Sequence, residues 1–161
     1  MTPLDKIKAF LTTCTDISFG YADIHFCNPD NLEDEQIGYS IDSRGNSLLT
    51  GKDGDWQQEW IVIASDELGD PIIVDTSSDQ LTVVSAPHGE GEWMPIVIAD
   101  SLDNFRDIIS LLTDVSKGRT NPIHIEQNPV TVKERKAIMT KIRKQNPETK
   151  LWFWEAFFDD D

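Results

Sequence analysis

Residues 60–75 read WIVIASDELGDPIIVD, two apolar runs separated by a short polar break. The continuous apolar run from Trp60 to Ala64 is typical of a strand buried on both faces. The break at residues 68–71 contains turn-forming residues, and the second apolar run begins at Ile72. Because the break is short, the two runs predict an antiparallel β-hairpin.

Two further apolar runs continue this pattern downstream. Residues 81–86 and 93–99 are typical of strands, and the glycine-containing stretch 87–92 between them is typical of a turn. Four runs joined by tight breaks predict an antiparallel meander. Upstream, residues 24–26 and 36–41 alternate between polar and apolar side chains, which predicts half-buried strand in both places.

Three amphipathic helices are predicted around the meander, because apolar residues recur at helical spacing in each segment. Each segment follows a Thr or Ser that can cap a helix, and the third opens with a capping box of Thr131 and Glu134. The predicted helices run from residue 3 to 13, from 102 to 117 and from 132 to near 146, after the caps Thr2, Ser101 and Thr131.

The segment 151–158 holds two tryptophans and three phenylalanines. It is too apolar to stay in water, so we expect it either to dock on the core or to bury itself against a second copy in a homodimer. The order helix, meander, helix, helix predicts an α+β fold in which helices cover one antiparallel sheet. We expect residues 1–161 to form a single domain, with the basic helix and aromatic tail at residues 130–158 as an added element.

The composition is that of a globular protein. The 161 residues are 39% apolar and 27% charged, and no apolar run approaches the roughly 18 residues of a membrane span. The start MTPLDK lacks the cationic and apolar regions of a signal peptide, so we expect the protein in the cytoplasm. Cys14 and Cys27 form no metal-binding pair and are expected to be buried or half-buried thiols.

Charge is distributed unevenly along the chain, whose net charge is −15. Residues 30–79 hold thirteen acidic and two basic side chains, whereas residues 117–150 hold nine basic and three acidic ones. Such an acidic protein repels nucleic acid and anionic membranes, and it would attract a basic protein partner. The alternative is that the acidic balance only keeps the protein in solution. The bases between residues 133 and 144 lie on one predicted helix without interleaved aromatics, so we interpret them as a solvated face or as a surface that pairs with the acidic half.

No motif in the sequence marks an active site, a cofactor site or a metal site. The three histidines are far apart in the chain, and nucleophile and phosphate-loop motifs are missing. The acidic stretch 53–59 lacks the glycine that a calcium loop needs at its sixth position. We therefore expect no enzymatic activity, no cofactor and no metal. Two alternatives stay open: a base at His88 oriented by Glu90 or Glu92, and a hydrolase with an unrecognised carboxylate site.

The middle of the chain carries a series of short motifs: WIVIA at 60–64, GDPIIVD at 69–75, VV at 83–84, HG at 88–89, Trp93, IVIA at 96–99 and SLDNF at 101–105. In this order, over residues 56–112, they resemble the SUKH superfamily, which includes bacterial immunity proteins and the fungal Smi/Knr group of cell-wall regulators. The resemblance implies a SUKH-like α+β domain that binds and neutralises a bacterial toxin domain, often a nuclease or a deaminase. The fungal branch implies the alternative of a regulatory scaffold with several cellular partners.

Acidic side chains gather on both sides of the first predicted strand of the hairpin. A nuclease tends to carry a basic cleft, so an acidic surface beside an aromatic side chain suits a toxin partner. We expect a basic toxin domain as the partner, and neither nucleic acid nor a membrane. The predicted partner-facing rim consists of Asp53, Asp55, Trp56, Glu59, Asp66, Glu67 and Asp70. For Trp56, as for each of the other tryptophans, a place in the core is the alternative.

Overall fold

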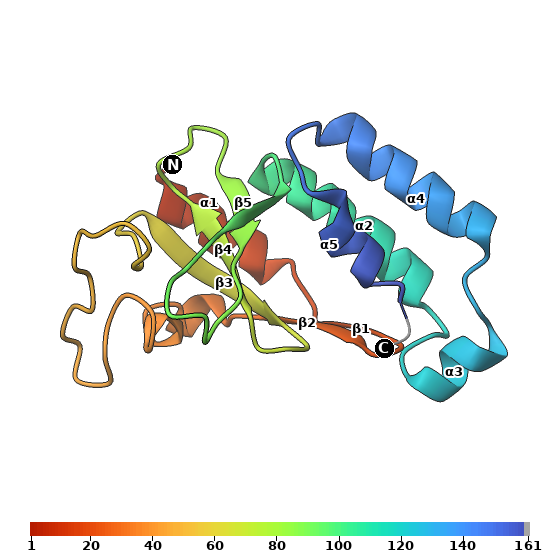
Figure 1. Cartoon of the computed structure of the whole chain (residues 1–161), viewed down its shortest axis with the longest axis horizontal. Helices are drawn as coiled ribbons and strands as arrows, with labels where there is room; N and C mark the ends of the chain where they lie inside the picture. Colours follow the sequence, from red (N-terminus) through yellow and green to blue (C-terminus); the bar gives the residue numbers. More distant parts are fainter. Residues whose placement is uncertain (160–161) are drawn as a thin grey trace.

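The predicted hairpin lies at the centre of an antiparallel sheet (Figure 1). The structure is a computed structural model that describes residues 1–159. In the hairpin, Trp60 pairs with Asp75 at one end and Ser65 pairs with Pro71 at the other. Within the described residues six strands follow one another in chain order across the sheet, which confirms the meander. They are β1 Ile17–Phe19, β2 Ala22–Phe26, β3 Trp60–Asp66, β4 Pro71–Asp75, β5 Thr82–Ser85 and β6 Ile96–Ala99.

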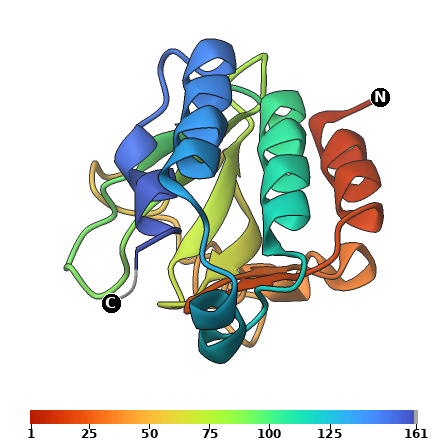
Figure 2. The same ribbon diagram turned by 90° about the vertical axis from the view of Figure 1, so that its right-hand side faces the viewer.

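Helices pack on this sheet, so the α+β fold is confirmed. Figure 2 shows α4, α2 and α1 side by side, with strands of the sheet behind α4 and α2. Helix α2 packs on β1, β5 and β6, and α4 packs on α2 and α5. None of the helices within residues 1–159 is long and apolar enough to cross a membrane. They are α1 Pro3–Thr12, α2 Leu102–Ser116, α3 Pro122–Gln127, α4 Val132–Gln145 and α5 Leu151–Ala156, with the 3₁₀ turns η1 Pro29–Asn31 and η2 Asp34–Gln36.

The three predicted helix caps are confirmed. Thr2, Ser101 and Thr131 each accept a hydrogen bond from the backbone N–H three residues later. The carboxylates of Asp5 and Glu134 accept the backbone N–H of Thr2 and Thr131 in turn, which completes two capping boxes. Each cap satisfies a backbone donor that would otherwise lack a partner, and this stabilises a helix by about 1 kcal/mol.

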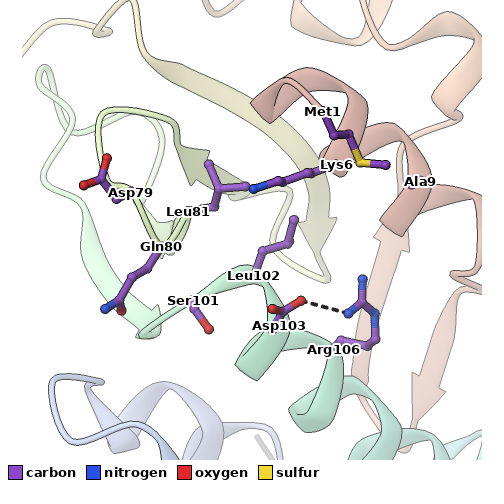
Figure 3. A pocket seen from close by; sticks show the side chains of 10 residues that line it. All are labelled: Met1, Lys6, Ala9, Asp79, Gln80, Leu81, Ser101, Leu102, Asp103 and Arg106. Atoms are coloured by element: carbon purple, nitrogen blue, oxygen red, sulfur yellow. Dashed lines mark hydrogen bonds and ion pairs between the residues drawn. The ribbon is translucent and has the colours of Figure 1, made fainter.

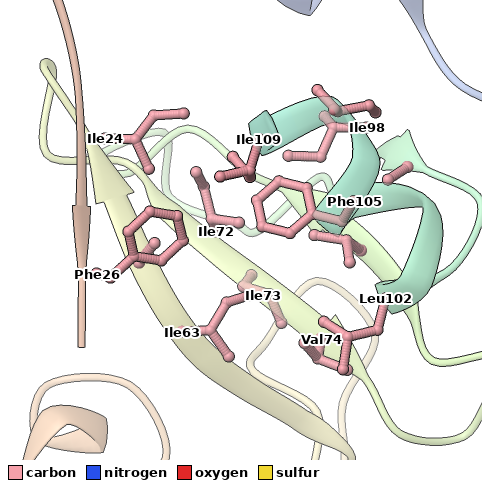
Figure 4. Close-up of a cluster of buried hydrophobic side chains, with 14 of the residues drawn as sticks. Ile24, Phe26, Ile63, Ile72, Ile73, Val74, Ile98, Leu102, Phe105 and Ile109 are labelled. Carbon is pink, nitrogen blue, oxygen red and sulfur yellow. The ribbon is translucent and has the colours of Figure 1, made fainter. Parts of the chain in front are cut away.

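The hydrophobic core lies between the sheet and α2 (Figure 4). Phe105 projects from α2 toward the strands, and it is fully buried together with Ile63, Ile72 and Ile98. In β4, four of five residues are buried, so both faces of this central strand are covered. That coverage explains why the sequence of the hairpin shows continuous apolar runs rather than alternation.

Residues 27–59 contain no strand, and part of this segment packs on β3. Strand β2 pairs with β3 only at residues 64–66, and a side chain of the segment bonds the backbone of β3 beyond that point. The side-chain amide of Gln36 accepts the N–H of Val62 at 2.8 Å and donates to its carbonyl oxygen at 2.9 Å. The predicted strand over residues 36–41 is therefore wrong. Gln36 ends a 3₁₀ turn, and Gly38 has a φ of +92°, which breaks an extended backbone.

Several predicted bounds also differ from the structure. Strand β6 begins at Ile96 rather than at residue 93, because the N–H of Trp93 donates to the Gly54 carbonyl in a loop. The sequence did not predict β1, which has only three residues, or α3, which begins at a proline. Val132, the first residue of α4, is 85% exposed although its side chain is apolar.

The aromatic tail, residues 151–158, docks on the core of its own chain. This confirms the first of the two expectations for the tail, the second being burial against a second copy. Trp154 is fully buried, and its Nε1 donates to the carbonyl oxygen of Ile98 at 2.7 Å. The N–H of Lys150 donates to the carbonyl of Val97 at 2.8 Å. Helix α5 therefore covers the outer edge of β6, and Trp154 and Phe157 belong to the core of this chain. The homodimer stays a prediction.

Candidate functional site

The predicted acidic rim is divided by β3. Three acids lie before the strand and three lie at its far end or in the turn that follows: Asp53, Asp55 and Glu59, which we call the loop acids, and Asp66, Glu67 and Asp70, which we call the hairpin acids. The strand has seven residues, which at about 3.3 Å each separate the two groups by about 20 Å. The hairpin alone therefore does not bring the six carboxylates into one patch.

Trp56 lies beneath the loop acids rather than beside them. Its side chain is 3% exposed and packs against Tyr39, Trp60 and Trp93, with ring centroids 4.9, 5.3 and 5.2 Å away. Its burial contradicts the prediction that Trp56 belongs to the partner-facing rim. The three surrounding rings, each half-buried, present the aromatic surface in its place.

The indole nitrogen of Trp56 is also unusual. Within residues 1–159 it is the one buried side-chain nitrogen or oxygen without a hydrogen-bond partner. An unpaired buried donor costs about 1–3 kcal/mol.

The connection between β5 and β6, residues 86–95, joins the two acidic groups. Near one end, the N–H of His88 donates to the Asp70 carboxylate at 2.9 Å. Near the other, the N–H of Trp93 donates to the carbonyl of Gly54 at 2.7 Å. The connection therefore contacts both the turn of the hairpin and the loop that precedes β3.

This connection carries two further exposed carboxylates, Glu90 and Glu92, and the second of them lies against Gly54 of the preceding loop. A glycine at position 54 allows the connection to approach this loop closely. The φ of Gly54 is +85°, which favours glycine, and a Cβ at this position would lie 2.9 Å from a carboxylate oxygen of Glu92. Apart from Asp66 and Asp70, which accept hydrogen bonds at the hairpin turn, the exposed and half-exposed carboxylates of these segments are what we call the acidic face: Asp53, Asp55, Glu59, Glu67, Glu90 and Glu92.

The other two hairpin acids hold the turn together. One oxygen of Asp66 accepts the N–H groups of Leu68 and Asp70 at 2.9 and 3.0 Å. The ring Nδ1 of His88 lies 2.6 Å from the Asp70 carboxylate, so this histidine is oriented by Asp70 and not by a glutamate of its own turn. Burial raises the pKa of Asp66 to about 6, and the nearby charges of Glu67 and Asp70 act in the same direction.

An apolar groove of about 470 Å³ lies beside the hairpin acids. Three large apolar side chains that are mostly exposed line it: Leu68 is 70% exposed, Met94 54% and Trp152 58%. They come from the β3–β4 turn, the β5–β6 connection and α5. Sequence reasoning missed this groove because no local pattern joins three positions so far apart in the chain.

The rest of the groove is apolar inside and acidic at its rim. Ile24 and Phe157 are buried, and Ile96 and Phe153 are half-buried, which gives the lining a continuous apolar part. Among the described residues that line the groove, none is Lys or Arg. Its acids are Asp23, Asp66, Glu67 and Asp70.

A second cleft, of about 510 Å³, lies between the starts of α1 and α2 (Figure 3). Lys6 and Arg106 line it together with Asp79 and Asp103. Arg106 and Asp103 form an ion pair at 2.9 Å, drawn as the dashed line in the figure. Because its charges balance, this cleft shows no preference for a charged partner.

The described residues contain no group of three or more His, Cys, Asp or Glu side chains that could hold a metal ion. Cys14 is half-buried and Cys27 is buried, and both are free thiols, as expected. Burial raises the pKa of Cys14 to about 11 and that of Cys27 to about 12. Both thiols are therefore protonated at neutral pH, in contrast to the thiolate of a catalytic cysteine.

No protein-family model matches the chain, and no match was found among curated proteins or among solved structures. The resemblance to the SUKH superfamily therefore stays a prediction from the sequence.

Proposed function

We propose that this protein binds and neutralises a basic toxin domain at a one-to-one ratio, as an immunity protein of the SUKH type. The acidic face is the observation that carries the proposal. Two of its acids directly precede the half-buried Trp60 and Trp93, so charge and aromatic surface lie together. In the stretch 50–59, which supplies the loop acids, the one base is Lys52.

Such a face suits a toxin that acts on nucleic acid or nucleotides. A cleft that binds phosphate is basic, and a protein surface with several carboxylates can fill it in place of the substrate. Opposite charge also speeds the encounter of the two proteins. The aromatic rings supply rigid apolar contact area, which is the usual source of affinity at the centre of an interface.

The experiment that tests the proposal is capture followed by growth rescue. The tagged full-length chain is used to capture partners from native lysate at about 50 and 300 mM NaCl, where charge screening differs strongly. We expect one basic, toxin-like domain at a one-to-one ratio, with less recovered at high salt. Its expression alone should stop growth, and co-expression with this chain should restore growth.

A matched pair of variants tests whether the loop acids take part. Asp53→Lys combined with Glu59→Lys reverses two exposed charges of the acidic face, and Glu126→Lys combined with Glu148→Lys reverses two exposed charges elsewhere. Growth rescue should be lost with the first pair and kept with the second. Rescue that survives the first pair would remove the loop acids from the interface.

Other results would favour the alternatives. Capture of several housekeeping proteins without a toxin would contradict neutralisation and favour a regulatory scaffold. Salt-insensitive turnover of a substrate by the purified chain would favour a carboxylate hydrolase.

A further inference from the structure

We infer that the apolar groove beside α5 is a docking site for a basic amphipathic helix of a partner protein. The inference rests on the proposed function in one respect, namely that the chain binds a basic protein. It goes further by naming a second contact surface and the kind of segment that occupies it.

Exposed apolar side chains from three separate elements converge on the groove. Leu68, Met94 and Trp152 are three of the ten large apolar side chains that are exposed in the described part, and all three line this one groove. Scattered single exposures need no explanation, whereas convergence of exposed apolar side chains from three elements marks an interaction surface.

Charge decides which partner fits. Asp23 and Glu67 are exposed at the rim, and Asp66 and Asp70 lie half-buried beside them. An anionic lipid or a nucleic acid would be repelled by these carboxylates. A segment with apolar side chains on one face and Lys or Arg along its edges would fill the groove and pair with the rim.

The fold favours a partner segment that binds as a helix over an extended segment that adds a strand to the sheet. An extended peptide needs free backbone groups at a sheet edge. At β6, the edge strand beside the groove, the carbonyl of Val97 already accepts from Lys150, and the carbonyl of Ile98 already accepts from Trp154. Recognition in the groove must therefore use side chains, as a helix does with apolar residues at positions i, i+3, i+4 and i+7.

A second copy is a poorer occupant. Two grooves brought face to face would place the four carboxylates of one copy against the four of the other, and like charges across an interface are unfavourable. The basic helix α4 of a second copy would match the groove in charge. Its one strongly exposed large apolar side chain among the described residues is Val132, which gives a single anchor at the start of the helix.

The test uses a defined probe, a fluorescein-labelled peptide of about 18 residues made of Leu and Lys in an amphipathic helical pattern. Anisotropy is measured with the full chain at about 150 mM NaCl, against a scrambled peptide of the same composition. We expect saturable one-to-one binding of the amphipathic peptide, and binding of the scrambled one weaker by about tenfold or more.

Matched variants place the peptide on the groove. Leu68→Ser with Trp152→Ser should weaken binding by about tenfold or more, and Met94→Ser alone should weaken it less. Ile123→Ser with Val132→Ser replaces two strongly exposed apolar side chains elsewhere and should leave affinity within about twofold. Asp23→Lys with Glu67→Lys should weaken binding and reduce its salt dependence. The control pair Glu126→Lys with Glu148→Lys should leave both the affinity and the salt dependence close to those of wild type.

Three outcomes would overturn the inference: equal binding of the scrambled peptide, an equal loss in the Ile123 and Val132 control, or unchanged affinity in the groove variants. Concentration-dependent self-association that the groove variants abolish would also overturn it, in favour of a second copy. Peptide binding at the groove without any growth rescue would reject neutralisation and leave the groove assignment standing, so the two failures can be told apart.

Discussion

The carboxyl group of Asp66 lies half-buried at the end of β3, where it accepts the N–H groups of Leu68 and Asp70. Burial raises its pKa from the ordinary value of 3.8 to about 6 in the folded protein. The folded state therefore keeps this proton to a higher pH than the unfolded chain does. The stability that protonated Asp66 contributes is complete below pH 3.8 and is lost as the pH rises through about 6.

Asp66→Asn removes the carboxylate whose ionisation lowers stability above about pH 6, and it keeps an oxygen that can accept both N–H groups. We expect the variant to melt about 2–4 °C above wild type at about pH 7.5, because the half-exposed carboxyl is partly hydrated and the gain is modest. The difference should vanish near pH 4. Thermal melts by circular dichroism at both pH values check this, with Glu59→Gln as a control that loses an exposed charge. A gain that persists at the lower pH would contradict the assignment.

The two cysteines give a second prediction at this scale. With pKa values of about 11 and 12, Cys14 and Cys27 hold very little thiolate at about pH 8. Iodoacetamide should therefore label neither in the folded protein during a time in which both are labelled in denaturant. Mass spectrometry reads out the labelled sites. Rapid labelling of Cys14 in the folded state would show that its surroundings are more open than described.

Trp56 shows what sequence reasoning could not reach at the residue scale. An aromatic residue among acids reads equally well as an interface anchor or as a core residue, since both need a large apolar side chain. The choice depends on Tyr39 and Trp93, which lie far away in the chain and cover it in the fold. Exposure of the carboxylates was easier to predict, since charged side chains favour water, and Asp53, Glu59 and Glu67 are exposed. Their contact with a partner stays a prediction.

Helix α5 stabilises the sheet through one side chain. Trp154→Phe removes the N–H that bonds the Ile98 carbonyl and leaves space in a fully buried site, so we expect unfolding free energy to fall by about 1–3 kcal/mol. Trp152→Phe, at an exposed position of the same helix, should change it by less than about 0.5 kcal/mol. Urea denaturation measures both. Equal effects would mean that α5 does not hold the edge of β6 through Trp154.

Elements with strong local signals were predictable. The continuous apolar runs of β3 and β4 and the caps at Thr2, Ser101 and Thr131 each depend on neighbours within a few residues. The prediction over residues 36–41 was wrong because a side chain, that of Gln36, bonds β3 in place of a backbone ladder. Strand β1 is too short to give a pattern.

The net charge of −15 has a consequence for the whole molecule. Repulsion among the carboxylates destabilises the compact state, and salt screens it. We expect the melting temperature at about pH 7.5 to rise by about 2–4 °C between 20 and 300 mM NaCl. Near the isoelectric point of about 4.4 the rise should disappear. A melting temperature that falls with salt at neutral pH would mean that ion pairs outweigh the repulsion.

The arrangement of the candidate surfaces was the least predictable feature at this scale. Residues 86–95 bring together the loop before β3 and the hairpin turn, and only the folded chain shows that they do. The groove likewise needs Leu68, Met94 and Trp152 from three elements. Contacts between residues far apart in the chain produce no regular spacing of residue types that a single sequence could show.

The central claim is that the acidic face binds a basic toxin domain. The most direct test is calorimetric titration of the captured toxin domain with wild type, with Asp53→Lys/Glu59→Lys and with Glu126→Lys/Glu148→Lys, at about 50 and 300 mM NaCl. We predict one-to-one binding that weakens with salt, a loss of about thirtyfold or more and a smaller salt dependence in the first variant, and affinity within about threefold of wild type in the second. The same affinity and the same salt dependence in all three proteins would contradict the claim.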